Sequence, residues 1–240
     1  MNNMAFYKQY TSLKRGNLTK EIPCEYNMIS DHIKKNILKY SNSEINILEI
    51  GCGEGDLMKY LKNKFNCRIL GIDISSRQVA LARKKKLNVI NLDIFEYFES
   101  LEDNKIYDLI ILVDVIEHLS KNKIEDLFFK LSKNLKKNGS VIFKFPNGYS
   151  PLSQIYFAAD FTHEWLPTST SLEQILGSSG LKLYLKKPLY IKVKSISSTI
   201  RFLILIFMDY FFRLIFCIVN GPSYMSTICT ANIFLIFKKY

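Results

Sequence analysis

Three glycines followed by an acid are the first residues of this sequence whose types and spacing could do chemistry. Gly51, Gly53 and Gly55 alternate with larger residues directly after a strand-like apolar run. Glycines at such a turn let the backbone approach a ligand closely, and the helix expected after them offers unpaired N–H groups to a carboxylate. Asp73 ends the next apolar run, where a carboxylate can accept hydrogen bonds from both hydroxyls of a ribose. Loop and acid together predict a site for a nucleoside-containing ligand.

The charges around this loop distinguish two kinds of cofactor. A dinucleotide site of the G-x-G-x-x-G type would have its third glycine at position 56, where this chain has Asp56. An acid there would repel a pyrophosphate, whereas the sulfonium and amino groups of S-adenosylmethionine tolerate Glu49, Glu54 or Asp56 nearby. We therefore predict S-adenosylmethionine as the cofactor, with Glu49 among the residues that bind it. A nicotinamide oxidoreductase and a glycine turn without a ligand are the alternatives.

The histidines are the second group, because an imidazole within hydrogen-bond reach of an acceptor hydroxyl can remove its proton. We predict His163 as the catalytic base, since segment 160–165 also contains two acids that could orient it and the single tryptophan. Trp165 would stack on a sugar or an aromatic ring, or would instead anchor the segment as a cover. His118 is the second catalytic candidate; otherwise it orders its loop by bonding a backbone carbonyl. We expect His32 at the surface.

An alternation of helical and strand-like segments positions these residues. Apolar residues at helical spacing in 25–40 predict a helix that lies over the domain. Strand-like runs separated by helical stretches follow at 45–50, 68–72, 88–90, 107–113 and 140–145. Such alternation predicts an α/β fold with a doubly wound, mostly parallel sheet whose ligands lie at the carboxyl ends of the strands. Asp108 begins a strand rather than ending one, so we expect it to be structural.

Two more strands complete the pattern. A helix with candidate caps at 169–171 and a stop signal at Gly180 precedes a strand at 182–185, and the last strand is expected at 231–237. The chain is therefore predicted to be a single domain, in which an N-terminal helical region, a cofactor-binding core, a hydrophobic insertion and a final strand follow one another at 1–44, 45–187, 188–228 and 229–240.

Five segments resemble the successive motifs of class I S-adenosylmethionine-dependent methyltransferases. In order they are ILEIGCGEG, GIDIS, NLDIFEYF, YDLIILVDVIEHL and LKKNGSVIFKFPN. The likeness covers about residues 44–187 and is greatest to the branch that includes the ubiquinone-biosynthesis O-methyltransferases. It implies a Rossmann-like sheet of seven strands with the last strand antiparallel.

The resemblance also implies roles for individual residues. Matched by position, the three loop glycines would hold the methionine part of the cofactor. The remaining matched positions are Asp73 at the ribose with Ile74 beside it, Asp93 and Ile94 at the adenine, and Asp114 and Val115 bordering the methyl-transfer site. For Asp93, a helix cap without a ligand is the alternative reading.

The acceptor is indicated by a second resemblance. The string SPLSQIYFAADFTHEWLPTSTSLEQIL and the final TANIFLIFKK resemble methyltransferases of bacterial surface-polysaccharide pathways, which implies a sugar hydroxyl as acceptor, free or on a lipid-linked intermediate. A polyprenyl quinone precursor is the alternative acceptor, and a membrane-associated cofactor-binding protein without turnover is the alternative class. VDVIEH lacks the Asn/Asp-Pro-Pro-aromatic run of amino-methylating enzymes, which disfavours N-methylation of a base. No metal site is predicted.

The insertion at 188–228 contains the most apolar run of the chain, 202–219, which is interrupted by Asp209 and Arg213. As a helix it would place these charges and Asn220 on one narrow face, opposite Leu203, Phe207 and Phe211. We expect peripheral membrane contact through 202–219. Packing on a partner, a groove for an isoprenoid and an ordinary buried helix are the alternatives.

Composition limits the partners and the cellular compartment to be expected, but it does not identify the function. The net charge of +11 is spread along the chain, which fits an anionic partner or surface but identifies none. Five cysteines without a CxxC pair argue against a disulfide framework or a zinc cluster. The N-terminus lacks the apolar run of a secretory signal. We expect a cytoplasmic protein at the inner membrane face, with no nucleic-acid partner.

Overall fold

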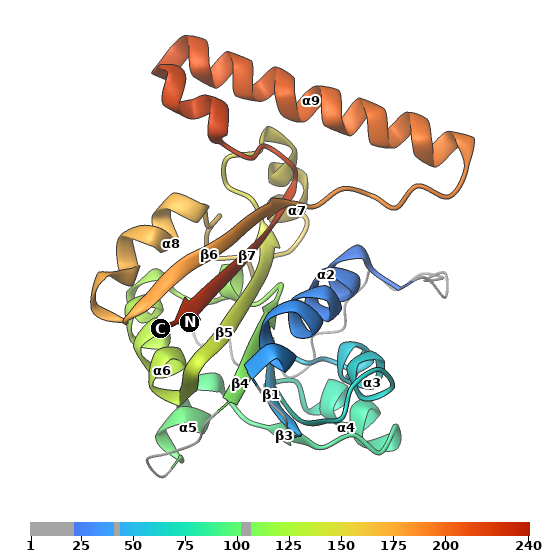
Figure 1. Ribbon diagram of the computed structural model, residues 1–240, viewed down its shortest axis with the longest axis vertical. Coiled ribbons are helices and arrows are strands. Elements are labelled where there is room, and N and C mark those ends of the chain that lie inside the picture. Colours follow the sequence, from blue (N-terminus) through green and yellow to red (C-terminus); the bar gives the residue numbers. More distant parts are fainter. Residues whose placement is uncertain (1–21, 41–43, 102–106) are drawn as a thin grey trace.

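The computed structural model describes residues 22–40, 44–101 and 107–240, which form an α/β fold around one twisted sheet (Figure 1). Its strands are β1 Ile45–Ile50, β2 Cys67–Asp73, β3 Val89–Asn91, β4 Tyr107–Val113, β5 Leu135–Pro146, β6 Leu181–Pro188 and β7 Asn232–Lys239. Within the described residues the order is β3-β2-β1-β4-β5-β7-β6. Strands β1 to β5 pair in parallel, and β7 is antiparallel to both β5 and β6. The predicted doubly wound sheet with an antiparallel last strand is confirmed.

Helices cover both faces of the sheet. They are α2 Cys24–His32, α3 Asp56–Lys62, α4 Ser76–Lys84, α5 Ile94–Glu99, α6 Ile124–Asn134, α7 Gln154–Ala158, α8 Ser169–Ile175 and α9 Ile196–Asn220. Alternate residues of β4 face opposite layers: Ile110 and Leu112 pack with α5, α6 and α8, whereas Leu109 and Ile111 pack with α2, α3 and α4. A strand buried on both faces explains why its sequence is continuously apolar.

The element boundaries differ from the sequence prediction in several places. The helix expected over 25–40 is α-helical only to His32 and continues as a π-helical turn, Ile33–Ile37, and a 3-10 turn, Leu38–Tyr40. Strand β5 begins at Leu135 rather than at residue 140. The cap of α8 is Thr168, just before the expected residues, and it forms a capping box with Ser171.

His32 is buried, so the prediction that it lies at the surface is wrong. Its side chain is 4% exposed, and Nε2 lies 2.9 Å from the Ser140 hydroxyl of β5. Burial and the nearby Lys238 lower the pKa of His32 to about 4. His32 follows Ile29 by three residues and therefore shares its core-facing side of the helix, which the polar sequence neighbours of His32 concealed.

Asp108 has the structural role expected for a residue that begins a strand. It is 8% exposed and accepts hydrogen bonds from the Asn46 backbone N–H at 2.8 Å and from Lys136 Nζ at 2.8 Å. Asp108 therefore joins the starts of β1 and β4 with the beginning of β5, at the end of the sheet opposite the glycine loop.

Helix α9 stands apart from the rest of the fold. It crosses the end of the molecule at which the parallel strands have their carboxyl ends, beyond α7 (Figure 1). Asp209 is the one buried residue of α9. The predicted helical insertion before the last strand is confirmed, and the alternative of an ordinary buried helix is wrong.

Candidate active site

The glycine loop connects β1 to α3 with backbone that only glycine adopts easily. Gly51, Gly53 and Gly55 have φ values of +70°, +53° and +75°. A Cβ atom on Gly51 would lie 2.4 Å from Val115, and one on Gly55 would lie 2.2 Å from Leu87. On Gly53 the nearest heavy atom would be 4.0 Å away. Two glycines are thus required by packing, whereas Gly53 borders open space that a ligand can occupy.

Asp73, at the end of β2, holds this loop in place. Its Oδ2 accepts a hydrogen bond from the Gly53 N–H at 2.7 Å, and Oδ1 accepts one from the Ser75 N–H at 2.8 Å. Burial raises the pKa of Asp73. Each carboxylate oxygen has a second lone pair, so ribose hydroxyls can still donate to it. The sequence indicated the acid at this position, but not that it also fixes the loop.

Glu49, the acid of β1, is buried two residues before the glycine loop begins. It is 5% exposed, and its Oε2 has no hydrogen-bond partner among the described residues. Burial, followed by repulsion from Asp73 and Asp56, raises its pKa well above the usual value. A buried carboxyl oxygen without a donor fits an incoming cation. Glu49, the open space at Gly53 and Asp73 are therefore compatible with the amino-acid and ribose parts of S-adenosylmethionine.

The adenine candidates lie at the end of the neighbouring strand β3. Asp93 caps α5, where its Oδ1 accepts a hydrogen bond from the Phe95 N–H at 2.8 Å, and Ile94 is buried. The side-chain amide of Asn91 donates to the backbone oxygens of Asp73 and Ile74, at 2.8 and 2.9 Å. The cap expected as the alternative for Asp93 is present, and it leaves one carboxylate oxygen for a ligand.

Asp114 follows β4, beside the glycine loop. It has a φ of +53°, which is uncommon for a residue with a side chain. Lys144 Nζ lies 2.6 and 2.7 Å from its two carboxylate oxygens. Burial alone lowers the pKa of Lys144, but Asp114 and the more distant acids outweigh this effect and raise it. The adjacent Val115 packs on Gly51, so β4 and the loop are in contact.

His118 and His163 lie together although they are far apart in the sequence. Their ring centroids are 4.6 Å apart. Segment 160–165 folds back onto the end of β4, where the Glu164 N–H donates to Glu117 O at 2.9 Å and Trp165 Nε1 donates to Ile116 O at 3.0 Å. Trp165 is 7% exposed, so it anchors the segment and does not offer its ring to an acceptor. No local sequence pattern indicated that the two histidines would be in contact.

The hydrogen bonds of both histidines indicate the same tautomer. His118 Nδ1 lies 2.9 Å from the Thr162 hydroxyl and 3.3 Å from Thr162 O, and that hydroxyl donates to Asp160 Oδ1 at 2.6 Å. His163 Nδ1 lies 3.3 Å from Phe157 O. A carbonyl oxygen only accepts, so Nδ1 carries the proton in each ring and the lone pair is on Nε2. Asp160 therefore orients His118 through Thr162. The sequence had led us to expect that it would orient His163.

Glu117 completes this group, which we call the histidine cluster: Glu117, His118 and His163. One ligand atom from each side chain lies within 4.8 Å of the others. Glu117 is fully buried, and neither carboxyl oxygen has a hydrogen-bond partner in the part of the chain that the structure describes. Burial, then repulsion from Asp114, raises its pKa well above the usual value.

The side chains of the histidine cluster are suited to two chemical roles, proton transfer and metal binding. Burial, followed by repulsion from His163, lowers the pKa of His118, which keeps its imidazole neutral near pH 7. A neutral imidazole can accept a proton, and two imidazoles with a carboxylate could also bind a transition-metal ion. Sequence reasoning missed Glu117, whose signal was its position shortly after β4 and directly before His118.

Comparison with known proteins identifies the family. A family model described as a methyltransferase domain matches residues 25–186. A ubiquinone biosynthesis O-methyltransferase of Pelagibacter ubique is 31% identical over 152 residues, which are 58% of this chain and 61% of the relative. A malonyl-[acyl-carrier protein] O-methyltransferase of Priestia megaterium is 39% identical over 115 residues, 45% of this chain and 40% of the relative. The chain thus matches less than two thirds of the length of either.

Solved structures show the same fold. A SAM-dependent methyltransferase from Archaeoglobus fulgidus superposes with a TM-score of 0.60 at 21% identity, covering 89% of this chain and 94% of that one. Magnesium protoporphyrin IX methyltransferase from Synechocystis, with bound SAM, gives 0.60 at 12% identity and covers 100% and 98%. The fold is that of the class I methyltransferases, and since the family model covers well over half of the chain, the protein belongs to the methyltransferase domain family.

Proposed function

We propose that the protein is an S-adenosylmethionine-dependent O-methyltransferase that methylates a sugar hydroxyl in surface-polysaccharide biosynthesis. One observation carries the proposal: the open glycine loop and the histidine cluster lie at the carboxyl ends of adjacent strands β1 and β4. A donor held by the loop and a hydroxyl beside the imidazoles would then face each other.

The bound cofactor supplies a methyl group that its sulfonium has already activated. The protein mainly has to align donor and acceptor and to exclude water. Glu49 meets the amino group, Asp73 the ribose and Asp93 the adenine end, while Asp114 and Val115 border the reacting groups. As the acceptor oxygen formed its bond to the methyl carbon, the bond from that carbon to the sulfonium sulfur would break and leave S-adenosylhomocysteine, and the proton of the hydroxyl would pass to an imidazole Nε2.

His163 is the proposed base, and His118 is its neighbour and second candidate. Both rings carry the Nδ1 proton and therefore direct a lone pair from Nε2. Burial, followed by repulsion from His163, lowers the pKa of His118, which weakens His118 as a proton acceptor. Burial, followed by repulsion from Asp114, raises the pKa of Glu117 beside them, which disfavours a full negative charge next to the two rings.

A phenolic hydroxyl of a polyprenyl quinone precursor is the second candidate acceptor. Its support is the likeness to ubiquinone biosynthesis O-methyltransferases, also from Rickettsia akari at 28% identity over 130 residues. Other relatives are named for different acceptors, such as a probable (S)-tetrahydroprotoberberine N-methyltransferase from Papaver bracteatum. A cofactor-binding protein without turnover is disfavoured by the intact glycine and acid positions.

The proposed location is the cytoplasm, at the inner face of the cytoplasmic membrane. It is supported by α9, which by length and composition is apolar enough to cross a membrane; 6% of its most apolar 18-residue window is buried. Peripheral contact through 202–219 would bring the enzyme to lipid-linked acceptors.

Two experiments test this function. Calorimetry should detect binding of S-adenosylhomocysteine and none of NADH; the reverse result would favour a nicotinamide enzyme. Mass spectrometry of the host's surface glycans, with and without the gene, should show the loss of one O-methyl group from a sugar. An unchanged glycan together with a changed quinone profile would transfer the proposal to the second acceptor.

A further inference from the structure

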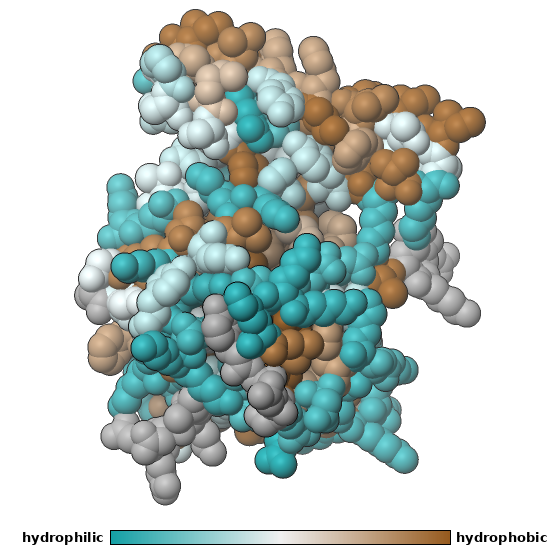
Figure 2. Space-filling model, in the orientation of Figure 1, coloured by the Kyte–Doolittle hydropathy of each residue, from teal (hydrophilic) through white to brown (hydrophobic). Residues whose placement is uncertain are grey.

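Helix α9 exposes a continuous apolar surface. It has 25 residues and is therefore about 37 Å long. Its most apolar window of 18 residues has a mean hydropathy of 2.4, and 6% of that window is buried. Apolar residues gather over this end of the molecule in Figure 2. The most exposed large ones along the helix are Ile196, Leu203, Phe207, Tyr210, Ile218 and Val219.

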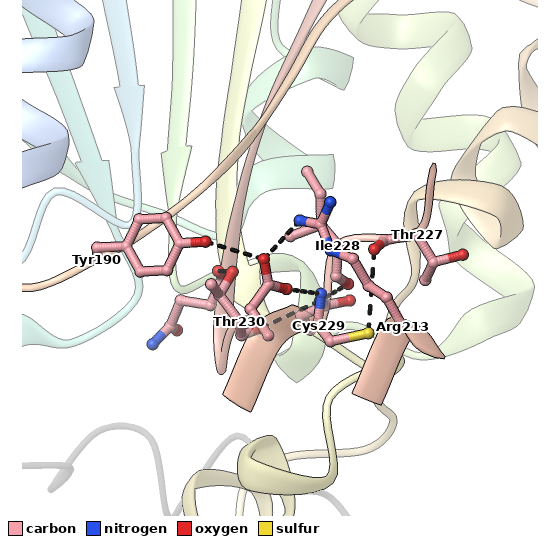
Figure 3. A network of polar contacts seen from close by, with 9 residues as sticks. Tyr190, Arg213, Thr227, Ile228, Cys229 and Thr230 are labelled. Atoms are coloured by element: carbon pink, nitrogen blue, oxygen red, sulfur yellow. Dashed lines mark hydrogen bonds and ion pairs between the residues drawn. The ribbon is translucent and has the colours of Figure 1, made fainter. Parts of the chain in front are cut away.

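The two charges within this apolar run are turned toward the protein. Asp209 is 1% exposed; its Oδ2 accepts from the Tyr190 hydroxyl at 2.8 Å and from Arg213 at 2.5 Å, and its Oδ1 accepts from the Cys229 N–H at 2.6 Å (Figure 3). We call Asp209, Arg213, Tyr190 and Cys229 the Asp209 cluster. The charge of Asp209 is paired inside the protein, so the outward face of α9 between 202 and 219 has none.

The Asp209 cluster also fixes how α9 can meet a bilayer. Asp209 lies near the middle of the helix. Its partner Tyr190 follows β6 and its partner Cys229 precedes β7, so both partners are anchored by strands of the sheet. A helix whose midpoint is held against the protein cannot have that midpoint at the centre of a hydrocarbon layer about 30 Å thick. At a bilayer, α9 would therefore have to lie along the membrane surface instead of crossing it.

The charges around α9 favour an anionic membrane as the partner of its apolar face. Between residues 188 and 231 the cations are Lys192, Lys194, Arg201 and Arg213, and the only acid is Asp209. Lys194 and Arg201, at the start of α9, are exposed. Basic groups beside an interfacial helix are attracted by anionic headgroups. A second copy of the chain would cover one stripe of α9, whereas a lipid surface accommodates a helix exposed along nearly its whole length.

The same end of the molecule carries the candidate active site. Helix α9 and the carboxyl ends of the parallel strands lie at this end (Figure 1). Ile155 of α7 and Phe161, which precede His163 in the segment after β5, are 71% and 85% exposed. These exposed apolar side chains therefore belong to the segment that carries His163, and α7 lies at the end of the molecule that α9 crosses (Figure 1).

We propose that the outward face of α9 lies in the surface of an anionic lipid bilayer, with the Asp209 cluster holding it there, so that the active site opens toward the headgroups. The acceptor is then a group carried by a lipid-anchored molecule at that surface. This last step rests on the proposed function; the docking of α9 does not.

Flotation with vesicles of equal parts phosphatidylcholine and phosphatidylglycerol tests the docking. The full-length protein should float with them, less so with phosphatidylcholine alone, and the triple variant Leu203→Ser, Phe207→Ser, Phe211→Ser should stay behind. The matched control is Leu38→Ser with Phe129→Ser, which removes exposed apolar side chains from other elements and should float normally. A wild type that stays behind, or that forms a dimer dispersed by the triple variant, would overturn the proposal.

Tryptophan fluorescence tests the orientation. With brominated phosphatidylcholine in the same vesicles, tryptophan placed by Phe207→Trp or Ile155→Trp should be quenched, and that placed by Phe129→Trp should not. Quenching at 207 but not at 155 would refute the claim that the site faces the headgroups. Binding of S-adenosylhomocysteine is measured on each variant. A wild type that floats but does not bind it would remove the proposed function and leave the docking of α9 intact.

Discussion

The cofactor side and the acceptor side of the candidate active site are held by different contacts. On the cofactor side, Asp73 at the end of β2 accepts a hydrogen bond from the Gly53 N–H, in the loop that follows the neighbouring strand β1. On the acceptor side, His118 meets Thr162 and Trp165 meets Ile116 across sequence separations of 44 and 49 residues. The cofactor side depends on the backbone geometry of two neighbouring strands. The acceptor side depends on segment 160–165 folding back onto the end of β4. Substitutions should therefore change ligand affinity on the first side and proton transfer on the second.

The largest effect is expected from Gly53→Val. The new side chain would enter the open space beside the loop, so binding of S-adenosylhomocysteine should fall below detection by calorimetry while the sheet stays folded. The matched control is Gly221→Val, which also has a positive φ and open surroundings but lies at the end of α9. A folded Gly53→Val protein that binds normally would exclude the loop as the site.

His163→Ala is expected to lower turnover by roughly 100-fold or more, because the proton acceptor is lost. The affinity for S-adenosylhomocysteine should stay near that of the wild type, since the ring belongs to the acceptor side. The comparison is His118→Ala, measured with the same acceptor. If His118→Ala reduces turnover more, with cofactor binding retained, the roles of the two histidines are the reverse of those proposed.

Asp73→Ala should weaken S-adenosylhomocysteine binding by about 1 to 3 kcal/mol, because ribose hydroxyls lose a charged acceptor. The structure adds that the Gly53 and Ser75 N–H groups lose their partner as well. Calorimetry measures the change, with Asp126→Ala on α6 as a control for removing a surface acid. Equal affinity for Asp73→Ala and wild type would place Asp73 outside the site.

The smallest effect expected is a pH-dependent gain in stability from Glu117→Gln. Burial raises the pKa of Glu117 in the folded protein, so above its unfolded pKa of about 4.3 only the unfolded chain ionises. The free energy of unfolding of the wild type is therefore undiminished below the unfolded pKa of Glu117, and it declines as the pH rises toward the folded pKa. The Tm of Glu117→Gln relative to wild type should be higher at about pH 8 than at about pH 5. The exposed Glu173→Gln is the control; a pH-independent difference would contradict the burial argument.

The parts of the fold that the sequence predicted are those set by local pattern. Continuous apolar runs gave the strands, and Ile45–Ile50 and Tyr107–Val113 match the expected bounds. Gly180, with a φ of +71°, stands where a stop was predicted. The expected last strand was identified, but its insertion between β5 and β6 follows from tertiary packing and had no local signal.

The acceptor side could not be predicted because its contacts are distant in sequence. Nothing near His163 indicates that Asp160 orients His118 through Thr162 instead. The burial of Glu117 and of His32 likewise depends on which helix or loop covers them. For α9, the spacing of Asp209 and Arg213 correctly indicated one polar face, but not that this face would bind the protein and leave the apolar one exposed.

The position of β7 has a consequence for the order of folding. Strand β7 pairs with β5 on one side and with β6 on the other, and it follows α9 in the chain. During synthesis β5 and β6 must therefore wait with unpaired edges until β7 has emerged, a non-local step that slows folding and exposes the chain to aggregation. While β5 and β6 wait, α9 leaves the ribosome before Cys229 does. During that interval Asp209 lacks the hydrogen bond that the Cys229 N–H donates to it in the folded protein.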